Sequence, residues 1–115
     1  MIKVMWFLKK AEHLSLAEFR KWWVEVHAPQ VRDTQKPFLV RYVVNVRADE
    51  DELPGMPKNP SDWDGIAEQW FATEADFRAV YGRASSPTRG DTLAHTSKLE
   101  RIIVSEHTYP TGSRE

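Results

Sequence analysis

His27 is the residue of this chain best placed to do chemistry. It is one of four histidines among 115 residues, and it follows an amphipathic segment that begins after Ser15. An imidazole has a reference pKa of about 6.5, so a small change in its surroundings lets it exchange protons near neutral pH. A histidine in the last turn of a helix also interacts favourably with the helix dipole, with no further role. Position alone leaves both interpretations open, a general acid or base at a pocket and a structural helix end.

The segment that must position His27 has a strong helix-start signal. Ser15 and Glu18 have the spacing of a capping box, and Leu14 and Phe19 have the spacing of a hydrophobic staple. The sequence therefore predicts a helix that begins at Leu16.

The expected helix has one apolar face and an expected end. The apolar positions recur at spacings of three and four: Leu16, Phe19, Trp23 and Val26. His27 comes four residues after Trp23, beside this stripe. Pro29 disfavours a helical conformation for the residue before it, which predicts that the helix ends near Ala28.

A second source of polar groups is the expected strand 39–47, which is rich in β-branched and aromatic residues. Alternation predicts two faces: Leu39, Arg41, Val43 and Asn45 on one, and Val40, Tyr42, Val44 and Val46 on the other. The first face mixes polar with apolar groups, which is more typical of a lined cavity than of a dry core.

The remaining elements follow from runs of apolar residues and from turn residues. We expect strands at 2–9, 63–72 and 99–109, helices at 74–81 and 87–95, and a loop at 48–62. The order β-α-β-β-α-β predicts an α+β, ferredoxin-like protomer with an antiparallel four-stranded sheet and both helices on one face. The strands are apolar on both faces, so the uncovered face must meet another surface, most simply a second sheet in a homodimer.

Composition excludes several classes of function. The formal net charge of -1, from 16 basic and 17 acidic residues, argues against nucleic acid or an anionic membrane as a partner. Without cysteine, disulfides, thiolate nucleophiles and cysteine-ligated metals are excluded, and the four scattered histidines lead us to expect no metal. We expect a single domain at 1–110 with a loose tail at 111–115, in the cytoplasm because no membrane helix or signal peptide is recognisable.

Three motifs in order resemble those of the EthD-like proteins of the dimeric α+β-barrel superfamily. They are Phe19-x-x-x-Trp23-x-x-x-His27-x-Pro29, then Asp64-Gly65-Ile66-Ala67-Glu68-x-Trp70-Phe71, then Val104-Ser105-Glu106-His107. The resemblance implies a protomer that dimerises through its sheet and holds a pocket between sheet and helices. It also implies chemistry on small ring compounds without a cofactor, as in isomerases, polyketide cyclases, decarboxylases and monooxygenases of this superfamily, although other members degrade haem.

Among these relatives the methylmuconolactone isomerases are the most similar in motif, and they suggest three catalytic residues. They carry a histidine that matches His27 and a tyrosine that matches Tyr42. Where they have a cysteine, this chain has Gln69, so their detailed mechanism does not carry over directly. We expect His27 to act as general acid or base, with Tyr42 or Gln69 holding a substrate oxygen.

Five further residues are candidates for substrate binding: Trp6, Trp23, Trp70, Asp64 and Glu106. An indole can stack on a planar ligand, although a core position is the commoner use of tryptophan. A carboxyl group in an apolar pocket has a raised pKa and can act near neutral pH, although strand-end charges in solvent are commoner. His107 and Glu106 would lie on opposite faces of a regular strand.

The sequence therefore predicts an isomerase or lyase that performs acid/base chemistry on a small lactone, phenolic or polyketide-like ring. A cofactor-independent monooxygenase of an aromatic compound and a ligand-binding accessory protein of a catabolic pathway remain open as alternatives, because a shared fold does not fix a reaction.

Overall fold

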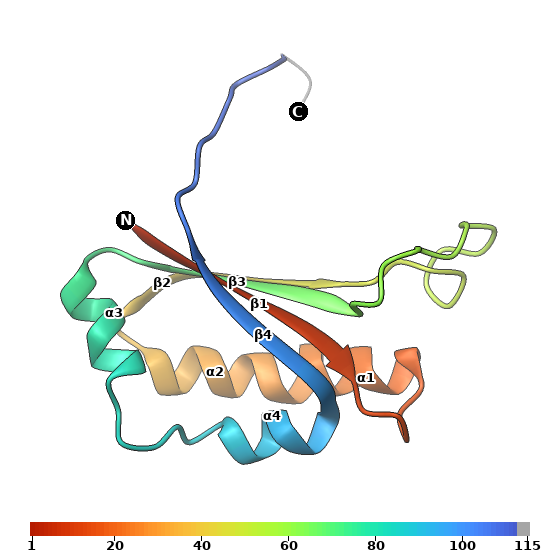
Figure 1. Ribbon diagram of the computed structural model, residues 1–115, viewed down its shortest axis with the longest axis horizontal. Helices are drawn as coiled ribbons and strands as arrows, with labels where there is room; N and C mark the ends of the chain where they lie inside the picture. Colours follow the sequence, from red (N-terminus) through yellow and green to blue (C-terminus); the bar gives the residue numbers. More distant parts are fainter. Residues whose placement is uncertain (113–115) are drawn as a thin grey trace.

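A computed structural model describes residues 1–112 as an antiparallel four-stranded sheet with its helices on one face (Figure 1). The elements are β1 (Ile2–Lys10), α1 (Leu16–Trp22), the π-helical turn η1 (Trp23–His27), α2 (Ala28–Gln35), β2 (Leu39–Val46), β3 (Gly65–Phe71), α3 (Glu74–Tyr81), α4 (Arg89–His95) and β4 (Thr96–Val104). The strands lie in the order β2-β3-β1-β4, and every neighbouring pair is antiparallel. The predicted ferredoxin-like α+β fold is confirmed. Of the tail expected at 111–115, residues 113–115 lie outside the described residues.

The predicted start of the first helix is confirmed in detail. The Ser15 hydroxyl accepts a hydrogen bond from the Glu18 amide at 3.0 Å, and the Ser15 amide donates to the Glu18 carboxylate at 2.8 Å. These two bonds satisfy backbone donors that a helix start leaves unpaired, so α1 begins at Leu16.

The predicted end of this helix near Ala28 is wrong, because the chain continues through η1 into α2 as far as Gln35. Ala28 keeps helical dihedral angles, φ -60 and ψ -43, and its amide donates to the Trp23 carbonyl five positions back. In a regular α-helix the ring of Pro29 would clash with the carbonyl four residues earlier. The wider π-turn accommodates the proline, so His27 lies inside a continuous helical segment rather than at its end.

The core lies between the helices and one face of the sheet. Trp23 and Phe19 are 1% and 0% exposed, and they pack with Trp22 and Leu16 against Leu8 and Ala67 of β1 and β3. A second cluster joins Val4, Phe71 and Val80. The side chains of β1 with even numbers thus face the helices, and those with odd numbers face the other side.

The prediction of which face of β2 lines the cavity is wrong. The face with Arg41, Val43 and Asn45 was expected there, but the face with Tyr42 lies at the cavity. Tyr42 and Val44 pack against the helices, whereas Arg41, Val43 and Asn45 belong to the uncovered face. The register shifts between Leu39 and Arg41, so Val40 is an extra residue in the ladder and alternation does not hold there. A bulge of this kind depends on the partner strand, and the alternation of β2 by itself does not reveal it.

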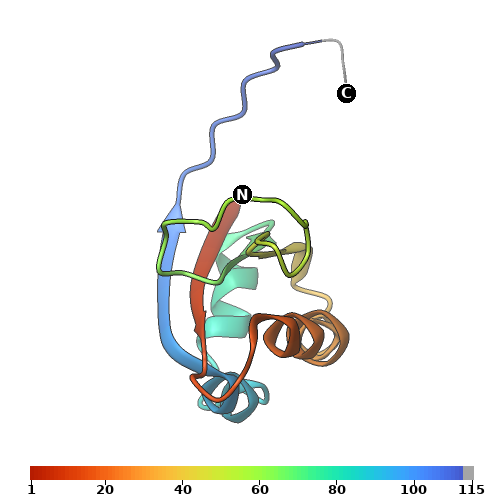
Figure 2. The ribbon, with the colours of Figure 1, turned by 90° about the vertical axis from the view of Figure 1, so that its right-hand side faces the viewer.

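The last strand begins and ends earlier than predicted, at Thr96 and Val104 rather than 99 and 109. Val104 pairs with Lys3 near the beginning of β1, so the residues directly after Val104 have no residue of β1 with which to pair. Residues 105–112 leave the sheet on the side away from the helices (Figures 1 and 2). The other boundaries agree with expectation to within two residues.

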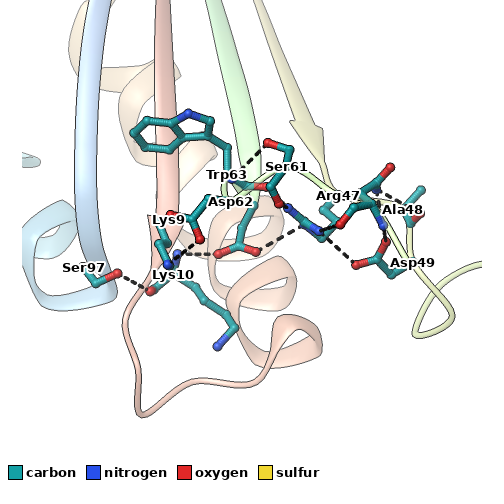
Figure 3. Close-up of polar contacts among 11 residues, drawn as sticks. Lys9, Lys10, Arg47, Ala48, Asp49, Ser61, Asp62, Trp63 and Ser97 are labelled. Atoms are coloured by element: carbon teal, nitrogen blue, oxygen red, sulfur yellow. Dashed lines mark hydrogen bonds and ion pairs between the residues drawn. The ribbon is translucent and has the colours of Figure 1, made fainter. Parts of the chain in front are cut away.

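Residues 47–64 connect β2 to β3 without a helix or strand, as predicted. Arg47, at the start of this loop, forms hydrogen bonds to residues near its end. Its guanidinium donates to the carbonyls of Asn59 at 3.0 Å and Trp63 at 3.1 Å, and to that of Ser61 (Figure 3). Asp64 lies 3.4 Å from the same guanidinium and accepts a bond from the Lys10 amide at 2.9 Å. Within residues 1–112, no helix has both the length and the apolar character that crossing a membrane requires.

We expect Gly65→Ala to destabilise the protein by about 1–3 kcal/mol, the usual cost of overpacking a core. A Cβ at this position would overlap the indole of Trp23 and lie 2.7 Å from the Asn45 carbonyl oxygen. Urea denaturation measures the loss. Gly90→Ala is the matched control, because a Cβ there meets nothing within 4 Å and alanine favours the helix. Equal stability of the two variants would contradict this account of the core.

Candidate active site

A cavity of about 400 Å³ lies between the helix-covered face of the sheet and the helices. Its walls come from β1, β2, β3 and β4 below, and from η1, α2, the end of α3 and α4 above. They include Trp6, Trp23, His27, Tyr42, Gln69 and Tyr81. This volume is within the range of small-molecule pockets, and four aromatic side chains in the lining, Trp6, Trp23, Tyr42 and Tyr81, suit a ring compound.

His27 reaches this cavity from η1 and is itself 5% exposed. Its Nδ1 lies 3.0 Å from Oδ2 of Asp91, and its Nε2 lies 3.2 Å from Oγ1 of Thr92. Both partners belong to α4. Thr92 lines the cavity and Asp91 does not, so Nε2 is the imidazole nitrogen on the cavity side.

The carboxylate of Asp91 also holds two other rings. The indole of Trp22 donates to both carboxylate oxygens at 3.1 Å, and Nδ1 of His95 lies 3.3 Å from Oδ1. Trp22 stacks on His27 at 4.7 Å and on His95 at 4.2 Å between ring centroids. These contacts fix the plane of the His27 ring as well as its distance from Asp91.

Burial lowers the pKa of His27 from 6.5, although the hydrogen bond and charge of Asp91 act in the opposite direction. The imidazole is therefore neutral at pH 7. The Asp91 carboxylate accepts the proton of Nδ1, so the lone pair of the neutral imidazole is on Nε2, on the cavity side and next to the Thr92 hydroxyl. This is the arrangement of a general base with a carboxylate that sets its tautomer.

Thr92 can serve both protonation states of that base. Its hydroxyl is 3.0 Å from the Thr88 carbonyl oxygen, to which it can donate. In that orientation Oγ1 accepts a hydrogen bond from Nε2 once His27 carries a second proton. With neutral His27 the same hydroxyl can turn and donate to Nε2.

A chain of hydrogen bonds crosses the floor of the cavity. The Trp6 indole donates to the Tyr81 hydroxyl at 2.9 Å, and Tyr81 donates to Oε1 of Gln69. Gln69 in turn donates to the Gln35 side chain at 3.3 Å with one of its two amide hydrogens. The orientation of the Gln69 amide is thereby fixed.

Tyr42 supplies a second hydroxyl at the cavity, on the strand next to Gln69, with which it is in register. Burial raises the pKa of Tyr42 to about 12. Its hydroxyl thus stays protonated across the physiological range and acts as a hydrogen-bond donor.

The structure brings five of the eight predicted site residues to this one cavity: Trp6, Trp23, His27, Tyr42 and Gln69. Asp64, Trp70 and Glu106 are not among the lining residues. Asp64 holds the base of the loop through Lys10 and Arg47. No residue of the loop 47–64 lines the cavity either.

Trp70 and Glu106 lie together on the uncovered face of the sheet. The Trp70 indole donates to Glu106 at 2.7 Å, and Nζ of Lys3 lies 3.2 Å from Glu106 and 2.8 Å from Glu68. The Trp70 hydrogen bond and Lys3 hold the pKa of Glu106 below its usual value, which is the opposite of the shift expected in an apolar pocket. Glu106 follows the end of β4, so it does not have to alternate with His107 as in a regular strand.

Asp91 and Thr92 are candidate site residues that the sequence reasoning missed. One signal was present, because Asp91 is the only acidic residue between positions 77 and 99. It also lies four residues before His95 on an expected helix. Nothing in the sequence relates it to His27, which is 64 positions away. Among residues 1–112, no three side chains of the metal-ligating types converge on a metal site.

Comparison with known proteins is consistent with this architecture. The sequence model of the EthD domain matches residues 11–86. No curated protein matches the chain.

Three solved structures have a similar fold. An EthD family protein of Bacillus halodurans has a TM-score of 0.67 and 17% identity, covering 93% of this chain and 99% of its own. The hydroxynitrile lyase of Passiflora edulis has a TM-score of 0.61 and 14% identity, covering 95% and 96%. A cofactor-independent oxygenase of Streptomyces nogalater has a TM-score of 0.55 and 16% identity, covering 94% and 93%.

We expect an NMR titration to find the His27 imidazole with a pKa below 6.5. In Asp91→Asn this pKa falls further, because the carboxylate that stabilises the imidazolium is gone. Asp33→Asn is the control, since Asp33 is an exposed carboxylate paired with Arg32 and leaves His27 unaffected.

The sign of the pH effect on stability follows from the same shift. Below about pH 6.5 the unfolded chain binds a proton at His27 before the folded protein does, so the free energy of unfolding falls as the pH falls through this range. A His27 pKa at or above 6.5 would contradict the assignment of a neutral base.

Proposed function

The chain belongs to the EthD domain family, and from this premise we propose that it is an enzyme that moves a proton on a small ring compound, as an isomerase or a lyase, without a cofactor. One observation carries the proposal. His27 presents Nε2 to an aromatic cavity while Nδ1 is held by Asp91 at 3.0 Å. The lowered pKa of His27 keeps it unprotonated and ready to accept a proton at neutral pH.

The substrate in this proposal has a hydrogen on a carbon next to a carbonyl group. Nε2 of His27 takes that proton, and the electron pair of the C–H bond moves into the carbonyl to form an enolate. Thr92 accepts a hydrogen bond from the new N–H, and the negative charge of Asp91 stabilises the imidazolium. The positive charge of His27 thus develops between two groups that are already in place to stabilise it.

Tyr42 and Gln69 are the proposed donors to the enolate oxygen. Tyr42 remains protonated because its pKa is raised to about 12. Gln69 has one amide hydrogen bonded to Gln35 and a second available for the substrate. Hydrogen bonds to a developing oxyanion are stronger than those to the original carbonyl, so both residues would favour the transition state.

The enolate then has two outcomes. In an isomerase, protonated His27 returns the proton to another carbon of the conjugated system. In a lyase, the electron pair expels a leaving group from the adjacent carbon, and His27 can protonate that group as it departs. The similar fold of a hydroxynitrile lyase is compatible with the second outcome, and the geometry of His27 serves both.

A second candidate is oxygenation of an electron-rich ring, which one observation favours. The cavity is lined by Trp6, Trp23, Tyr42 and Tyr81, which suit a planar aromatic compound. The similar fold of a cofactor-independent oxygenase gives it further support. Oxygen consumption during turnover would identify this reaction, whereas the isomerase or lyase proceeds equally well under argon.

We expect His27→Gln to lower kcat/KM by about 10²–10⁴-fold, the usual contribution of general acid/base catalysis. Activity is measured on a panel of lactones, phenols and hydroxylated carbonyl compounds, in air and under argon. The wild-type kcat/KM falls at low pH with an apparent pKa below 6.5, because only the neutral imidazole accepts a proton.

His13→Gln, at an exposed position, is the matched control, and circular dichroism confirms that both variants fold. Unchanged turnover in His27→Gln would overturn the assignment. Binding of ring compounds without any product would favour a ligand-binding accessory protein instead.

We also propose that the protein is a homodimer that packs through the uncovered face of its sheet. This face carries the apolar side chains Met5, Phe7, Val43, Ile66, Ile102 and Val104, and Ile102 is 48% exposed. The same face carries the ion network of Lys3, Glu68 and Glu106, and its apolar side chains are stabilised by burial against a partner.

Ile102→Glu should therefore convert a dimer to a monomer in analytical ultracentrifugation, because it introduces a charge into the interface. Ile103→Glu is the matched control, since Ile103 is the next residue, 56% exposed, on the helix side of the same strand. A monomeric wild type, or a dimer that survives Ile102→Glu, would contradict the proposed interface.

A further inference from the structure

The charged side chains that line the cavity all have one sign. They are Arg83, Arg89 and Arg101; no aspartate or glutamate is among the lining residues, and the carboxylate of Asp91 lies behind His27. The chain as a whole carries a net charge of only -1. The positive charge at the cavity is therefore a local feature, and such a field attracts an anion.

Arg101 is the most informative of the three arginines. It lies on the helix side of the edge strand β4, opposite Trp6 in the ladder with β1. Its guanidinium is 5.0 Å from the ring centre of Tyr81 and 5.6 Å from that of Trp6, two side chains of the cavity floor. Among residues 1–112, no carboxylate forms an ion pair with it.

The other two arginines differ from Arg101. Arg83 donates to the Thr34 carbonyl at 2.8 Å, which ties the segment after α3 to α2. Arg89 begins α4 and is exposed, as Arg101 is, but within residues 1–112 its guanidinium has no hydrogen bond, ion pair or ring contact, so it adds to the positive field without a fixed position. Arg101 alone combines a guanidinium without an acidic partner and a fixed place over the rings of the cavity.

We propose that the substrate of this site carries a carboxylate on or beside its ring, and that Arg101 binds this carboxylate at the mouth of the cavity. The inference deepens the proposed function and rests on it for the reaction at the other end of the substrate. A guanidinium binds a carboxylate with two parallel hydrogen bonds, which fixes the orientation of the bound acid as well as its position.

In this arrangement, different residues of the cavity bind different parts of the substrate. The carboxylate pairs with Arg101, the ring lies against Trp6 and Tyr81, and the reacting carbon is directed toward His27. The stacking of Arg101 over the two rings holds its guanidinium in place before the substrate binds. A neutral ring compound of the same shape would lose the ion pair and keep only the apolar contacts.

The test compares acids with their amides in binding to the intact protein. Benzoate, cinnamate and 1-naphthoate are paired with benzamide, cinnamamide and 1-naphthamide, and dissociation constants are measured by NMR titration. We expect at least one acid to bind about tenfold more tightly than its amide, as a charged hydrogen-bonded pair provides. Arg101→Gln removes this preference, and Arg101→Lys retains part of it because the charge remains.

Arg78→Gln is the matched control. Arg78 is exposed on α3, pairs with Glu74 and is not among the lining residues, so its loss changes the net charge equally. If every acid binds no better than its amide, or if the preference survives Arg101→Gln, the inference is overturned.

Failure of the proposed function would look different. His27→Gln should abolish turnover and retain the preference for acids, because the carboxylate lies at the mouth. Turnover that survives in His27→Gln, with the acid preference intact, overturns the reaction and supports the anion site. Turnover that requires His27 with no acid preference overturns only the anion site.

Discussion

The carboxylate of Asp91 is the interaction on which the rest of the site depends. It accepts hydrogen bonds from the Trp22 indole and from Nδ1 of His27, and it lies 3.3 Å from His95. These contacts join α4 to the long helical segment on the other side of the cavity. Without the carboxylate, a buried indole N–H and a buried imidazole N–H would both lose their acceptor, at a cost of about 1–3 kcal/mol each. The same contacts determine which nitrogen of His27 faces the cavity, so the stability of the fold and the proposed chemistry depend on the same carboxylate.

The π-turn at Trp23–His27 has a comparable influence on geometry. It lets the helix continue past Pro29, and it turns Trp23 and His27 into the interior together, at 1% and 5% exposure. Gly65 completes the arrangement, because only a residue without a Cβ leaves room for the Trp23 indole. A helix that ended before the proline would have removed α2, and with it Gln35 and one wall of the cavity.

The two faces of the sheet provide two different environments. The helix-covered face has a cavity whose lining includes four aromatic side chains, a neutral histidine and three arginines. The uncovered face has an ion network in which Lys3 pairs with Glu68 and Glu106 beside Trp70. Alternation along β3 assigns neighbouring residues to these two faces, which is why Gln69 lines the cavity and Trp70 does not. A single strand thus contributes one residue to the cavity and the next to the surface where we place the partner subunit.

The sequence by itself determined the order of the elements, the capped start at Leu16 and the ferredoxin-like topology, because capping, periodicity and turn residues act over a few positions. Of the eight residues that the sequence proposed for the site, five line the cavity, and His27 is the foremost of them. Tertiary structure decided the rest. A π-turn overrode the usual effect of Pro29, a bulge paired with β3 changed the faces of β2, and Asp91 met His27 across 64 positions. These outcomes depend on contacts between distant segments, which no local pattern specifies, and they are what converts a histidine beside an apolar stripe into a candidate base.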